Sequence, residues 1–97
     1  MPTYIVLMKL TEKGVRTIKD GPKRVKENAK IMEKMGGKMT GFYLTMGEYD
    51  YVGIGEAPND ETALTFLLGM GAQGFVTTTT LKAFTAEEFE KVVKNLP

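Results

Sequence analysis

The sequence contains no cysteine, histidine, tryptophan or serine. Without cysteine there are no disulfide bonds and no thiolate ligands for a metal. Without histidine there is no imidazole ligand, so haem cannot be held by an axial histidine. A Ser-His-Asp triad and a cysteine nucleophile are also excluded. The side chains left for chemistry are those of Asp, Glu, Lys, Arg, Tyr and Thr, and we expect neither a metal nor a cofactor.

A strong charge of one sign is also missing, because 13 basic residues stand against 12 acidic ones. This balance argues against a nucleic-acid partner, which requires a dense basic surface. No apolar run approaches the roughly 20 residues needed to span a bilayer. The start, Met1 to Tyr4, has neither a basic n-region nor a cleavage site. We therefore expect a cytoplasmic protein that contacts no membrane.

The chain has the composition of a globular protein and the length of one domain. It has 97 residues, of which 42% are hydrophobic and 26% are charged. We expect a single domain over residues 1–97. Periodicity predicts strands over residues 4–10, 38–46, 49–57 and 75–84, and helices over 22–35 and 59–70. A tight turn at Gly47 and Glu48 is expected to join the second and third strands. Thr85 and Glu88 form a capping box that begins a third helix.

The order of these elements is β-α-β-β-α-β followed by a helix, which is the ferredoxin-like pattern of an α+β protein. The connections predict a four-stranded antiparallel sheet with two helices on one face. The strands are apolar or β-branched at both alternating positions, so neither face of the sheet is expected to be left in water. We infer that a second copy of the chain covers the other face. The helix over residues 62–70 is apolar nearly all round, which predicts burial on more than one side.

Several segments resemble the GYD-domain family, in the same order and spacing from about Thr3 to Phe84. The segments are Gly47-Glu48-Tyr49-Asp50, Glu56-Ala57-Pro58, residues 10–24, Gly36-Gly37-Lys38, Tyr43, and Leu81-Lys82-Ala83-Phe84. The resemblance implies a dimeric α/β barrel in which two ferredoxin-like protomers pack their sheets together. It implies no reaction, because one fold hosts many functions. The chain departs from the family at Thr77 and Thr79, where the family commonly has Arg and Glu, so a site that uses those two charges is not expected.

Asp50 is the residue of greatest chemical interest, because aspartate is rare inside strands and this one follows a turn. In one interpretation its carboxylate accepts hydrogen bonds from backbone N–H groups or pairs with Arg16 or Lys19, and so ties the connector to the hairpin. In the other, Asp50 is a general base or a ligand anchor beside the phenols of Tyr49 and Tyr43. The sequence alone leaves both open.

A basic cluster, Arg16, Lys19, Lys23 and Arg24, surrounds the start of the first helix. Such a cluster is usually a solvated surface, but guanidinium groups at a helix N-terminus can hold a carboxylate or a phosphate. Arg16, Lys19 and Arg24 are therefore candidate ligands of a small anionic or polar metabolite.

The strands also carry tyrosines, threonines and glycines on defined faces, among them Thr77 and Thr79 as further candidate ligands. Gly53 and Gly55 leave room on their face, either for a partner's backbone or for a small molecule. The pattern G-x-G-x-x-G over residues 69–74 follows a helix and precedes a strand, the reverse of a dinucleotide site, so we interpret it as a helix end and turn. The scattered methionines are expected to fill the core rather than bind copper.

These observations leave three hypotheses. The first is a homo-oligomeric module that binds a small molecule or regulates another protein. The second is a cofactor-free oxygenase or isomerase in which Asp50 and Tyr49 or Tyr43 transfer protons. The third is a purely structural assembly protein.

Overall fold

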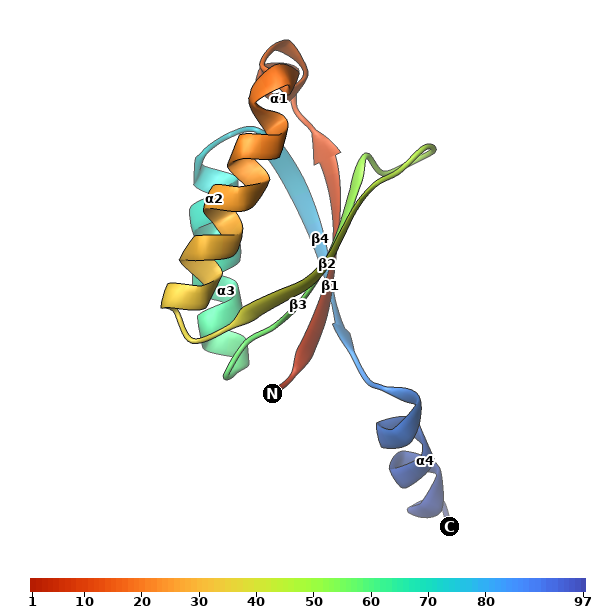
Figure 1. Cartoon of the computed structure of the whole chain (residues 1–97). Coiled ribbons are helices and arrows are strands. Elements are labelled where there is room, and N and C mark those ends of the chain that lie inside the picture. Colours follow the sequence, from red (N-terminus) through yellow and green to blue (C-terminus); the bar gives the residue numbers. More distant parts are fainter.

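The structure, a computed structural model, describes all 97 residues and contains every predicted element (Figure 1). The elements are β1 (Thr3–Leu10), α1 (Glu12–Arg16), the 3-10 helix η1 (Ile18–Asp20), α2 (Gly21–Lys34), β2 (Lys38–Leu44), β3 (Tyr51–Glu56), α3 (Asp60–Ala72), β4 (Val76–Ala83) and α4 (Ala86–Lys94). The connector between β1 and α2 thus contains two short helical elements, α1 and η1.

The four strands form one antiparallel sheet in the order β2-β3-β1-β4. Helices α2 and α3 lie side by side on one face of it (Figure 1). This arrangement confirms the α+β, ferredoxin-like fold predicted from the order of the elements.

Local side-chain chemistry explains where the helices begin. Asn59 Oδ1 accepts a hydrogen bond from the Thr62 N–H at 2.8 Å and so caps α3. The predicted capping box of α4 is present, because Thr85 and Glu88 each accept the other's backbone N–H. Gly74 has φ +80°, a conformation that favours glycine. The glycine-rich pattern therefore closes α3 and leads into β4, as predicted.

The connection between β2 and β3 is longer than predicted. The strands end at Leu44 and begin again at Tyr51, so residues 45–50 form the link in place of a tight turn at Gly47 and Glu48. The Thr45 N–H still donates to the Asp50 carbonyl at 2.8 Å, but Asp50 N–H turns to β1 and donates to the Met8 carbonyl. Because the Asp50 N–H bonds to β1, it does not pair with β2, and the two strands end at Leu44 and Tyr51.

The buried core lies between the sheet and the two long helices. Its members are few: Tyr4, Met8, Met32, Ala57, Ala63, Met70 and Val76. The register places Tyr4, Val6 and Met8 toward this core, and Ile5 and Leu7 toward the opposite face of the sheet.

The opposite face of the sheet, which we call the open face, is not covered by any helix of this chain (Figure 1). Strands β1 and β3 place Ile5, Leu7, Val52 and Ile54 on it, all only half-buried. Helix α4 continues beyond the end of β4, away from α2 and α3 (Figure 1), and all its residues are exposed. No helix of the structure has the length and hydropathy that a membrane span requires.

The prediction that the helix over residues 62–70 is buried on more than one side is wrong for the single chain. Ala63, Phe66 and Met70 face the sheet, but Leu64 and Leu68 are 59% and 75% exposed on the outer side of α3. No element of this chain lies over them, so α3 presents an apolar outer surface to solvent.

Candidate functional site

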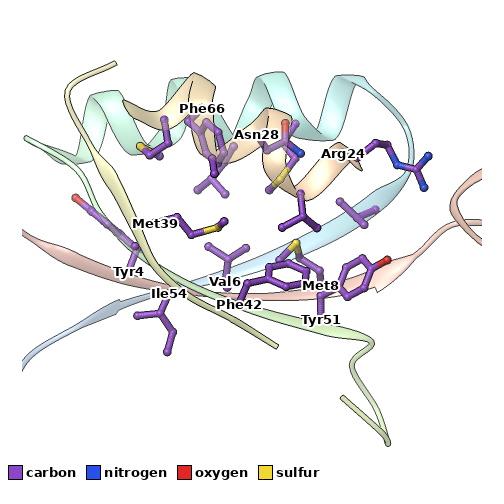
Figure 2. A pocket seen from close by; sticks show the side chains of 18 of the residues that line it. Tyr4, Val6, Met8, Arg24, Asn28, Met39, Phe42, Tyr51, Ile54 and Phe66 are labelled. Atoms are coloured by element: carbon purple, nitrogen blue, oxygen red, sulfur yellow. The ribbon is translucent and has the colours of Figure 1, made fainter. Parts of the chain in front are cut away.

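A cavity of about 100 Å³ lies between the sheet and the helical layer. Figure 2 shows Val6, Met8 and Phe42 rising from the strands toward Asn28 and Phe66, which come down from α2 and α3. Most of the lining is apolar. The site therefore has the concave shape and apolar lining of a small-molecule site, in a smaller volume than most such sites have.

Two glycines on β3 help to leave this space open. Gly53 and Gly55 pair with Val6 and Tyr4 of β1, which line the cavity, and so share their face of the sheet. A Cβ atom at Gly53 would come within 3.3 Å of the Met8 Cε atom. The room that the sequence predicted beside these glycines therefore lies on the helix-covered face, not on the open face.

The polar groups of the cavity are few, and three of them, Arg24, Lys38 and Glu56, carry a charge. The Asn28 Oδ1 atom accepts a hydrogen bond from Gln73 Nε2 at 3.3 Å, which links α2 to the end of α3. The Tyr51 hydroxyl lies near the start of α2, where a Cβ atom at Gly21 would be 3.2 Å from it. Both groups can offer a hydrogen bond to a small molecule.

Arg24 is the one predicted ligand-binding residue that lines the cavity, but its charge is already engaged. Its guanidinium lies 3.9 Å from the centre of the Phe75 ring and donates to the Thr17 carbonyl at 3.1 Å. In Figure 2 the guanidinium points outward, away from the cavity. Arg24 thus holds the connector before α2 against Phe75.

Asp50 binds the backbone. Its Oδ2 atom accepts the Leu10 N–H at 2.8 Å, in addition to the two backbone bonds described above. The structure therefore matches the interpretation in which the Asp50 carboxylate accepts a hydrogen bond from a backbone N–H group. It does not form the alternative ion pair with Arg16 or Lys19. Asp50 ties the β2–β3 connection to the end of β1.

The other residues of the catalytic hypothesis point elsewhere. Tyr49 is half-buried, with the Lys9 ammonium 5.4 Å from its ring centre, and its carbonyl accepts the Thr45 hydroxyl. Tyr43 pairs with Val52 and is 61% exposed on the open face. Neither tyrosine lines the cavity, nor does Asp50. Proton transfer by these residues stays a prediction.

The remaining predicted ligands are spread over the surface. Arg16 lies 3.9 Å from Glu12 on α1, and Lys19 is exposed on η1. Thr77 and Thr79 are exposed on the open face, where they pair with Lys9 and Leu7 of β1. The structure does not bring these four residues to one place.

Sequence reasoning missed a polar cluster at the opposite end of the sheet. The Tyr4 hydroxyl donates to Asp60 Oδ1 at 2.5 Å, and Lys82 lies 3.0 Å from the same oxygen. Burial and the bond to Asp60 raise the pKa of Tyr4 to about 12. The bonds from Tyr4 and Lys82 lower the pKa of Asp60. The cluster fastens β1 and β4 to the start of α3, and no local sequence signal announces it.

Two comparisons with known proteins find similarity over most of the chain. The family model described as the GYD domain matches residues 4–93. A protein of Thermus thermophilus named "Glutamine synthetase and cystathionine beta-lyase binding protein" is 37% identical over 84 residues, which are 86% of this chain and 88% of that protein. No solved structure matches the chain. The resemblance stated from the sequence is confirmed, and the chain belongs to the GYD-domain family.

Proposed function

We propose that the protein is a homodimeric, cytoplasmic binding module that docks on a metabolic enzyme and regulates it. The observation that carries this proposal is that this chain leaves apolar side chains uncovered on two opposite surfaces: they are half-buried on the open face of the sheet and exposed on the outer side of α3. Large exposed apolar surfaces are typical of interaction sites. One surface suits a second copy of the chain and the other suits the enzyme.

The open face is the surface that suits a second copy. Ile5, Leu7, Val52 and Ile54 occupy its centre, and in Figure 2 Ile54 points away from the cavity side of the sheet. Two such faces placed together would bury these side chains, as two sheets do in a sandwich. A closed dimer needs self-complementary surfaces, and one apolar face repeated in both copies meets that requirement. The dimeric barrel implied by the family has this arrangement.

Helix α4 supports the same assembly. All the large apolar residues of this segment are exposed: Phe89, Val92 and Val93 on the helix and Leu96 just after it. A helix of nine residues is marginal in water without tertiary packing. The second copy would supply that packing, because α4 leads away from its own helices (Figure 1).

The outer side of α3 suits the enzyme, because it lies on the other side of the domain from the open face (Figure 1). Leu64 and Leu68 are one turn apart and project from it. Beside them a Cβ atom at Gly69 or Gly71 would meet no other atom within 4 Å, so a partner can approach this helix closely. The neighbouring α2 carries four exposed lysines, Lys23, Lys26, Lys30 and Lys34, against two exposed glutamates, Glu27 and Glu33. The surface therefore fits an apolar patch with an acidic border.

The relative from Thermus thermophilus supports a protein partner, since its name describes a protein that binds two enzymes. We propose that this chain likewise binds glutamine synthetase or cystathionine β-lyase of its own organism. Calorimetric titration of each purified enzyme with the purified protein tests this. We expect saturable binding to at least one of them, and no binding to either would refute the proposal.

A variant with lysine at both Leu64 and Leu68 tests the surface. This variant should still fold and dimerise but should no longer bind the enzyme, because two charges would be buried without a partner in the contact. The matched control is Val15→Lys, which makes the same kind of change at an exposed apolar residue of α1. Equal binding by the double variant and the control would place the contact elsewhere.

A second candidate function, small-molecule binding, is favoured by the cavity. A ligand there would contact both long helices and the sheet, and would stabilise the packing of α3, whose outer side is proposed to meet the enzyme. Such a ligand could regulate the docking by mass action, because it would bind the packed state of α3 more tightly than a loosened one.

A further inference from the structure

We infer that the cavity takes a neutral, mostly apolar molecule of about the size of one aromatic ring, with a single hydrogen-bonding group. This inference rests on the second proposed function and adds the chemical class of the ligand. It departs from the anionic metabolite that Arg16, Lys19 and Arg24 suggested in the sequence. Three features of the cavity lead to it: its volume, the position of its charges, and two neutral polar groups.

The volume limits the ligand to one ring. The cavity holds about 100 Å³, and an engineered apolar cavity of about 150 Å³ in another protein binds benzene. Methionine side chains from four different elements line the space: Met8, Met32, Met39 and Met70. Because methionine is unbranched and flexible, these side chains can move apart and adjust to the shape of a bound ring.

The position of the charges excludes an ionised ligand from the middle of the cavity. Arg24 turns its guanidinium outward to Phe75 and Thr17. Lys38 and Glu56 line the far end, where their backbones lie opposite each other in the β2–β3 register. A carboxylate or ammonium among the methionines and Phe42 would be buried without a partner, which strongly disfavours its binding.

Two neutral polar side chains, Asn28 and Tyr51, line the cavity, and a polar atom of the ligand could bond to either of them. Asn28 uses its Oδ1 atom for Gln73, so its NH₂ group is free to donate. The Tyr51 hydroxyl makes no hydrogen bond within the chain, and its ring lines the same cavity. A ligand hydroxyl or carbonyl could accept a hydrogen bond from Asn28 while its ring lies among the methionines.

Phenol, benzene and benzoate are the probes that test the ligand class. They share one ring and differ in carrying a hydroxyl, no polar group or a charge. Protein labelled with ¹³C at the methionine methyl groups is titrated with each probe and followed by NMR. We expect saturable shifts of several methyl signals with phenol, weaker binding of benzene by about tenfold, and no binding of benzoate at the same concentrations.

The outcomes separate the class from the function. Binding of benzoate as tight as that of phenol would overturn the neutral class and leave small-molecule binding intact. Binding of none of the three would overturn both.

Variants then locate the site. Asn28→Leu should reduce the affinity for phenol about tenfold and leave that for benzene unchanged, whereas Glu27→Leu, on the exposed side of the same helix, should change neither. Equal loss of both ligands in Asn28→Leu would refute the hydrogen-bonding role. Ala29→Leu should fill the cavity and abolish binding of both. If that variant does not fold, Gly53→Ala, which adds only one methyl group beside Met8, should weaken both. Unchanged binding in the cavity-filling variant that folds would place the ligand elsewhere.

Discussion

Replacing Asp50 by alanine should loosen the attachment of the β2–β3 connection to the end of β1. The variant removes the Oδ2 atom that accepts the Leu10 N–H at 2.8 Å. It leaves the two backbone bonds of residue 50 in place, so the connection should loosen rather than detach. No catalytic role is needed for this effect, because the lost contact joins two parts of the scaffold.

The size of the effect follows from the kind of bond that is lost. A hydrogen bond to a charged group contributes about 1.5–3 kcal/mol, and an unpaired buried donor costs about 1–3 kcal/mol. The bond is only partly buried, so water can replace the carboxylate in part. We therefore expect a loss of about 1–2 kcal/mol in the free energy of unfolding. For a domain of this size, each kcal/mol lowers the melting temperature by about 4–8 °C.

Urea denaturation and thermal melting measure this loss, with wild type and variant compared at the same protomer concentration because assembly adds to stability. Asp50→Asn is the matched control, since its amide oxygen can still accept the Leu10 N–H without the charge. It should lose less than Asp50→Ala. A melting curve of Asp50→Ala that coincides with that of the wild type would refute the structural role assigned to this carboxylate.

Three further predictions concern other parts of the chain. The pKa of Tyr4 is raised to about 12 in the folded protein. The contribution of the protonated Tyr4 to the free energy of unfolding should therefore be fully present below pH 10 and be lost between pH 10 and 12. Tyr4→Phe should remove that part of the pH dependence in alkaline melting curves, and an unchanged profile would contradict it. Gly69→Ala should stabilise the free protein against urea by about 0.5–1 kcal/mol, because alanine is the better helix former and its Cβ meets nothing in the chain. The same Cβ would meet the partner, so enzyme binding measured by calorimetry should weaken. A gain in both stability and binding would be inconsistent with docking on α3. Gly14→Ala should lower the melting temperature sharply, because its Cβ would lie 2.2 Å from the Phe75 carbonyl oxygen; a melting temperature equal to that of the wild type would show that the backbone there can move.

The fold could be predicted because its signals are local. Apolar and β-branched runs of strand length, the Asn59 cap and the Thr85–Glu88 capping box each lie within one element, and the order of the elements restricts the topology to few choices. The error in the β2–β3 connection has a different origin. Asp50 bonds to Met8 and Leu10, about 40 residues away in the sequence, and no local pattern carries that contact.

The candidate site could be predicted only in part. Gly53 and Gly55 correctly indicated open space, but the sequence did not say on which face of the sheet it would lie. Arg24 was expected to face a ligand, and its engagement with Phe75 depends on packing between α2 and the segment before β4. The volume of the cavity depends on how all its side chains fit together, which residue types alone do not determine.

The mass of the protein in dilute solution tests the central claim most directly, because the whole account requires a partner for the open face. Sedimentation equilibrium at micromolar concentration should give twice the chain mass of 10.7 kDa. A particle that keeps the mass of one chain at every concentration, with Ile5 and Leu7 bare or covered by its own α4, would contradict the account.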